Sequence, residues 1–260
     1  MRASIRIATI LYAVLIYGFI FLPVVTLVLF SFQATSFPIP PFSGPSLRWY
    51  QAVLSDARLT SALINSLFVA VISSAVATVL GFLAAWGFAR FWLPASALLR
   101  GLITLPLTVS YLIIGMGLLV LFNAIGIPKS LTAAGIGHVV INLPLCFAIL
   151  YSQMGEHQAN IERAARDLGA KEWQVLTLVT APMLWPALFA SFFLSMTFSW
   201  DEFIISFLLT RFDTTLPVEI WNLLRSGLNP KTNAVGSLVF LVSIAFVLLF
   251  ELVFFRKSRT

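Results

Sequence analysis

Charged side chains are scarce in this sequence. Lys, Arg, Asp and Glu make up 10% of its 260 residues, whereas a soluble domain carries about 25%. Hydrophobic residues make up 60% and gather in long stretches. Six stretches contain no charged residue: Ile7–Leu47, Leu59–Ala89, Gly101–Pro128, Ser130–Gly155, Trp173–Trp200 and Thr232–Phe250. Each is long enough for the roughly 20 apolar residues that cross about 30 Å of hydrocarbon, which predicts an integral membrane protein.

The sequence also lacks the motifs of familiar catalysts. Its one cysteine, Cys146, has no partner for an internal disulfide. It contains no phosphate loop of the Gly-x-x-x-x-Gly-Lys-Ser/Thr type, no metal-type Cys/His cluster and no Gly-x-Ser-x-Gly elbow. We therefore expect no catalytic residue, no metal and no cofactor in this chain. The net charge of +6 lies at the ends of apolar stretches, where it sets topology, so we expect no nucleic-acid partner.

The spanning elements are predicted to be helices, because the alternating strands of about ten residues that build membrane barrels are missing. We expect an all-α protein with one transmembrane domain over residues 1–260 and a cytoplasmic loop at 154–181. The six helices are expected near 8–32, 61–89, 101–123, 132–153, 182–209 and 234–255. The first exceeds the 7–15 residues of a signal-peptide core, so it is expected to stay as a helix.

The distribution of basic residues predicts the orientation. With the amino terminus inside, ten Lys and Arg residues lie inside and six outside, so both termini are expected in the cytoplasm. Two long outer segments, Gln33–Thr60 and Arg211–Asn233, each contain a short amphipathic stretch. These segments either receive a partner at the outer surface or serve as plain connectors.

The loop between the fourth and fifth helices is unusually polar. Within residues 156–172, Ile161, Ala164, Ala165 and Leu168 recur at helical spacing, and Gly169 follows as a helix end. This pattern predicts a short helix with one small apolar face and charge elsewhere. Such a helix either lies on the membrane surface as a connector or lets another protein come close.

The loop resembles the EAA signature of permeases from binding-protein-dependent ABC importers. Ala164-Ala165, Gly169 and, after nine intervening residues, Val179-Thr180-Ala181-Pro182 keep its spacing, although Arg163 stands where the motif has Glu and Ala181 where it has Leu. The resemblance implies a six-helix type I permease whose short coupling helix seats in an ATPase subunit. The residues that it assigns to this coupling are Glu162, Arg163, Ala164, Ala165, Asp167, Gly169 and Pro182.

A second run resembles the spermidine/putrescine branch of these permeases. Ser199-Trp200-Asp201-Glu202-Phe203 in the fifth helix is followed by Thr214-Thr215-Leu216-Pro217. The resemblance implies a path for a polyamine or similar small cation in the bacterial inner membrane. It also implies a second homologous permease, two ATPase subunits that hold the ATP and Mg, and an extracytoplasmic binding protein.

The fifth helix also suggests a path from its own residues. At 100° per residue, Ser191, Ser195, Ser199, Glu202 and Ser206 fall within about 80° of one another. An ionisable group at membrane depth costs about 2.5–3.5 kcal/mol, so it should face a cavity or a partner. We therefore predict a path formed by Glu202, Asp201, Ser199, Ser195, Tyr111 and Trp221, the last two offering aromatic faces to a cation.

Two other interpretations stay open. In the first, the carboxylates of Asp201 and Glu202 bond a neighbouring helix, and their role is structural. In the rival functional class, the chain is a self-contained secondary transporter or channel that uses the same two carboxylates for ion coupling. The two classes differ in whether the chain transports anything without an ATPase.

Overall fold

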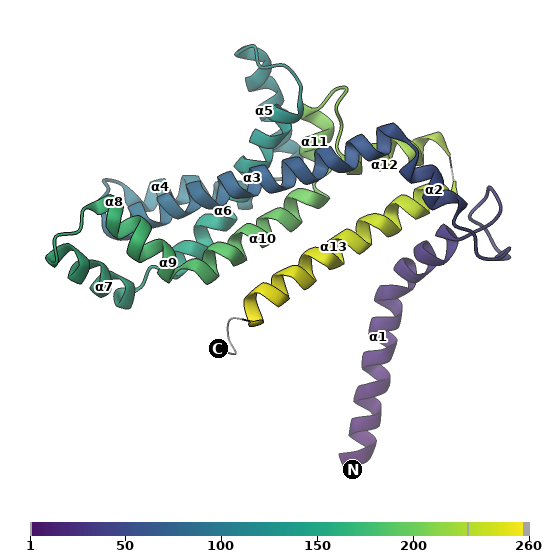
Figure 1. Cartoon of the computed structure of the whole chain (residues 1–260), viewed down its shortest axis with the longest axis horizontal. Helices are drawn as coiled ribbons and strands as arrows, with labels where there is room; N and C mark the ends of the chain where they lie inside the picture. The colour runs from purple at the N-terminus through teal and green to yellow at the C-terminus, as the bar shows by residue number, and fades with distance from the viewer. Residues whose placement is uncertain (1, 228, 257–260) are drawn as a thin grey trace. The chain divides into compact units, whose positions relative to one another are not determined.

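The computed structural model describes residues 2–227 and 229–256, which are almost entirely helical (Figure 1). Two compact units can be separated, each described here by itself. The first comprises Met1–Thr60 with Glu219–Ile244, and the second comprises Ser61–Val218 with Ala245–Thr260. Helices α3 (Ala57–Arg90), α12 (Leu216–Ser226) and α13 (Pro230–Arg256) each contribute to both.

The first unit contains α1 (Arg2–Ser31) and the short α2 (Arg48–Leu54). Most described side chains of α1 are exposed, as expected of a helix whose surroundings are lipid rather than protein. The segment after α1 is fixed to α2, because the Trp49 indole donates to the Gln33 carbonyl at 2.7 Å. The Ser31 and Tyr50 hydroxyls also bond, at 2.7 Å.

The second unit contains the remaining helices. Its order is α4 (Ser96–Thr104), a 3₁₀ turn (Leu105–Leu107), α5 (Tyr111–Ala124), α6 (Leu131–Ser152), α7 (Glu156–Asp167), α8 (Glu172–Gln174), a π-helical turn (Val175–Thr180), α9 (Ala181–Met183), α10 (Trp185–Asp201) and α11 (Ile204–Leu209). Helices α3 and α6 approach closely, since a Cβ on Gly81 would lie 2.8 Å from the Cys146 Cβ. Helix α10 packs on α6, and α11 packs on α5 and α6.

Within the described residues, four helices are long and apolar enough to cross a membrane, or up to six if each of two bent pairs is one span. The sequence predicts single helices over 101–123 and 182–209, but the structure breaks both. The first bends by 105° between Leu107 and Tyr111, and the second bends by 75° between Met183 and Trp185. Pro186 lies in the first turn of α10, just after the second bend, and Pro106 lies in the 3₁₀ turn just before the first bend. At the first turn of a helical segment the missing proline N–H needs no helical partner.

Candidate functional site

Helix α7 forms the predicted short helix of the polar loop. It ends where the sequence predicts, because Gly169 adopts a φ of +89°, which favours glycine. The Gly169 amide donates to the Arg166 carbonyl at 2.8 Å, and the Ala170 amide donates to the Ala165 carbonyl at 3.0 Å. This pair of bonds is a Schellman motif, so the helix end is fixed by its own backbone.

The predicted apolar face of α7 is largely exposed on the surface of the chain. Leu168 is 90% exposed, and Ile161 and Ala164 are exposed as well. Trp173, in α8, is 61% exposed beside this loop. The other predicted coupling residues Arg163, Asp167, Gly169 and Pro182 are also exposed, while Ala165 is half-buried. Most of the predicted coupling residues therefore lie on the surface of the isolated chain.

Glu162 is the exception among the predicted coupling residues, because it is fully buried. The Arg90 guanidinium donates to its two carboxylate oxygens, from Nε at 2.6 Å and from Nη2 at 3.3 Å. The Thr180 hydroxyl donates to the same carboxylate at 2.9 Å. Sequence reasoning missed Arg90 and Thr180 as partners, since each lies far from Glu162 along the chain.

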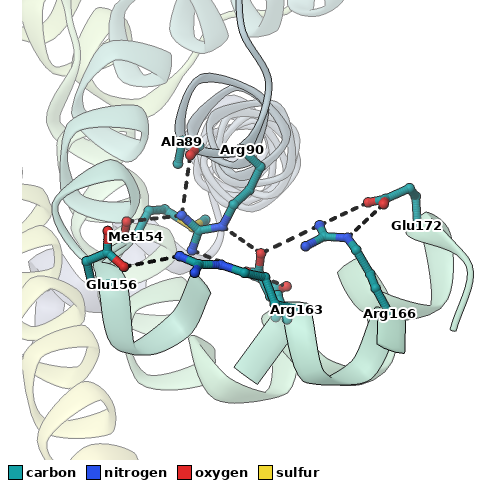
Figure 2. A network of polar contacts seen from close by, with 9 residues as sticks. Ala89, Arg90, Met154, Glu156, Arg163, Arg166 and Glu172 are labelled. Carbon is teal, nitrogen blue, oxygen red and sulfur yellow. Dashed lines mark hydrogen bonds and ion pairs between the residues drawn. The ribbon is translucent and has the colours of Figure 1, made fainter. Parts of the chain in front are cut away.

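The polar contacts continue around this carboxylate (Figure 2). Arg90 also donates to the Met154 carbonyl at 3.3 Å, just before α7 begins. Arg166 lies 3.9 Å from Glu162 and makes a two-point contact with Glu172, at 2.7 and 3.1 Å. The hydrogen bonds that Arg166 donates to the Glu172 carboxylate raise the pKa of its guanidinium. In contrast, Arg163 and Glu156 form a pair at 3.2 Å whose side chains are 61% and 86% exposed.

The serines of the fifth span face the chain's own helices. Ser191, Ser195, Ser199 and Ser206 are all buried. The Ser199 hydroxyl bonds Ser73 of α3 at 3.0 Å and His138 Nδ1 of α6 at 2.6 Å. His138 Nε2 in turn bonds the Ser206 hydroxyl at 3.0 Å. One imidazole therefore bridges α10 and α11, so Ser199 and Ser206 serve helix packing here.

The two carboxylates lie at the break between α10 and α11. Glu202 has an extended backbone, is 7% exposed and accepts a hydrogen bond from the Ile205 amide at 2.9 Å. Asp201, the last residue of α10, is exposed on the isolated chain. The predicted stripe of serines and Glu202 requires a continuous helix, but the helix is interrupted at Glu202 itself.

The two predicted aromatic path residues fall in different parts of the chain. Tyr111 begins α5 and packs against the apolar cluster that contains Ile205 and Leu209 of α11. Trp221 belongs to α12 in the other unit and is 42% exposed. The structure therefore groups Tyr111 with α11, which follows the break, and Trp221 with α12.

The chain is similar to known proteins over most of its length. Residues 77–259 match the family described as "Binding-protein-dependent transport system inner membrane component". The spermidine/putrescine transport system permease protein PotC of Escherichia coli (strain K12) is 27% identical over 94% of this chain and 92% of its own. The putrescine transport system permease protein PotI of the same strain is 34% identical over 87% of this chain and 84% of its own.

A solved structure has the same fold. It is that of a bacterial alginate ABC transporter in complex with an alginate pentasaccharide-bound periplasmic protein, and one of its chains superposes with a TM-score of 0.74. That match covers 100% of this chain and 97% of the other at 17% identity. At this identity the likeness concerns the fold alone.

Proposed function

The chain belongs to the family of binding-protein-dependent transport system inner membrane components, and from this premise we propose that it forms half of an ATP-driven path for a polyamine. The family and the all-α permease fold predicted from the sequence are confirmed. The chain is a multi-pass membrane permease subunit of an ABC importer rather than an enzyme. The cargo, the subunit composition and the orientation are the proposed parts.

The cargo proposal rests chiefly on the relatives, since PotC and PotI carry the names of spermidine and putrescine transport. The chain's own residues support it. Asp201 and Glu202 place two carboxylates at a helix break in the fifth span, and a carboxylate at membrane depth favours a cation or a paired neighbour. Asp201, exposed on the isolated chain, is the side chain best placed to face the path or the second permease.

The partner proposal rests on α7. Leu168 at the end of α7 and Trp173 of α8 are large apolar side chains exposed within a charged loop, and an exposed apolar surface with a polar rim is typical of a protein contact. We propose that an ATPase subunit, which holds ATP and Mg, seats on this surface. A second permease, a second ATPase and an extracytoplasmic binding protein complete the assembly, with both termini in the cytoplasm.

Reconstitution tests this proposal. The complex that copurifies with the chain from its native membrane is placed in proteoliposomes, and putrescine uptake is measured with and without ATP. We expect uptake only with ATP and the binding protein, and we expect Asp201→Asn with Glu202→Gln to lower it at least tenfold. Gradient-driven uptake by the purified chain alone would instead establish a secondary transporter or channel.

A pair of variants tests whether the ATPase binds at α7. Leu168→Asp places a charge on the exposed face of α7 and should reduce the amount of ATPase that copurifies. Leu54→Asp makes the same change at the end of α2, where the side chain is 72% exposed, and should leave it unchanged. Equal recovery of ATPase with both variants would remove α7 as the docking surface.

A further inference from the structure

Glu162 is held differently from every other side chain predicted to contact the ATPase. Its carboxylate has no solvent exposure, and the side chain of Arg90 is only 8% exposed. A buried carboxylate cannot reach an ATPase surface without a rearrangement of the loop. Its three close donors, two nitrogens of Arg90 and the hydroxyl of Thr180, all come from this chain.

The donors come from two elements that lead into the membrane. Arg90 is the last residue of α3, which runs for 34 residues. Thr180 ends the π-helical turn that leads through α9 into α10, the helix that carries Asp201 at its far end. One carboxylate therefore ties α7 to the ends of two spans at the same time.

The attachment is rigid because its geometry is fixed at several points. A guanidinium that meets a carboxylate through two nitrogens is held in orientation as well as in distance. Arg90 is further anchored by its bond to the Met154 carbonyl at 3.3 Å, and Met154 is itself buried beside Phe147 and Leu150 of α6. The Glu162–Arg90 pair thus joins the middle of α7 to the packed core of its unit.

We propose that Glu162 and Arg90 are positioning residues that convert a movement of α7 into a movement of α3 and of the fifth span. This proposal rests on the proposed docking of an ATPase at α7. In this assignment the exposed residues of α7 contact the ATPase, and the buried pair passes the displacement on. Glu162 thereby has an internal role instead of the ATPase contact that the resemblance implies.

The experiment measures putrescine transported per ATP hydrolysed by the reconstituted complex. Arg90→Lys keeps the positive charge but loses the two-point contact, and Thr180→Val removes one donor with little change in shape. We expect Arg90→Lys to lower the ratio at least fivefold and Thr180→Val about twofold, while ATPase copurification stays at the wild-type level. Exchange of the two groups, Arg90→Glu with Glu162→Arg, should recover part of the ratio lost in Glu162→Gln.

A matched control uses the exposed ion pair at the opposite end of α3. Arg58→Gln breaks the contact with Glu219, in which the Arg58 side chain is 78% exposed, and should leave the ratio unchanged. A wild-type ratio in Arg90→Lys, or an equal fall in Arg58→Gln, would overturn the proposal. Absence of ATPase from the wild-type complex would overturn the proposed function instead, so the two failures are distinguishable.

Discussion

Helix α3 has ion pairs at both of its ends, and they differ in burial. At its start, Asp56 bonds Lys231 at 2.6 Å with side chains 29% and 19% exposed, and Arg58 meets Glu219 at 3.4 Å while 78% exposed. At its end, Arg90 and Glu162 are 8% and 0% exposed. A helix of 34 residues is about 50 Å long, longer than about 30 Å of hydrocarbon, so both sets of charges can lie outside the lipid core.

This difference shows that the effect of an ion pair on stability depends more on its burial than on its presence. An exposed pair contributes about 0–1 kcal/mol. Removal of one partner from a buried pair costs about 3–5 kcal/mol, because the other charge stays desolvated. Between the two ends, Ser73 joins α3 to Ser199 through neutral groups only, as suits the depth at which a charge is most costly.

The largest effect is expected at the buried end. Arg90→Ala leaves the Glu162 carboxylate buried without its charged partner, and should lower the free energy of unfolding by about 3–5 kcal/mol. Denaturant titration of the purified chain in micelles measures it. Glu156→Gln, which breaks the exposed pair of α7, should cost no more than about 1 kcal/mol. Similar losses of stability in the two variants would contradict the expected difference between the buried and the exposed pair.

A smaller effect is expected in the middle of the helix bundle. His138→Phe keeps a ring but removes the bonds to Ser199 and Ser206. At about 0.6–1.7 kcal/mol for each interhelical hydrogen bond in a membrane, the loss should be roughly 1–3 kcal/mol. The same measurement on His157→Phe, an exposed position of α7, should give almost no change. If His138→Phe leaves the free energy of unfolding unchanged, apolar packing alone holds α10 and α11 against α6.

The smallest effect is expected at the start of α3 and depends on pH. The hydrogen bond from Lys231, with the Arg58 and Leu59 amides, lowers the pKa of Asp56 below its usual 3.8. A depressed carboxyl pKa contributes stability above pH 3.8 that is lost as pH falls through the lower, folded value. We expect this contribution of Asp56 to the free energy of unfolding to be about 1 kcal/mol.

Thermal unfolding of the wild type between pH 5 and pH 2, compared with Asp56→Asn, measures this contribution. The asparagine keeps an oxygen for the start of α3 but cannot titrate. The difference between the two proteins should therefore shrink as the pH falls. A constant difference across the range would assign the effect of Asp56 to helix capping instead of the ion pair.

Local signals in the sequence were sufficient for much of the fold. Long uncharged stretches predict spanning helices because backbone groups in lipid need partners within the same segment. Gly169 marks the end of α7 because only local φ is involved. The family followed from the spacing of Ala164, Ala165, Gly169 and Pro182. The helix breaks could not be predicted from the sequence, because a membrane helix tolerates proline and the neighbouring helices decide whether it bends.

The sequence by itself therefore determined the class of protein, the place of the short helix α7 and the identity of the charged residues available to it. Only the tertiary structure decided which of those charges are buried. Glu162 and Arg163 are adjacent in the sequence, yet one is fully buried against Arg90 and the other is 61% exposed beside Glu156. Burial depends on which distant segments pack together, and residues 72 positions apart along the chain carry no local signal of their contact.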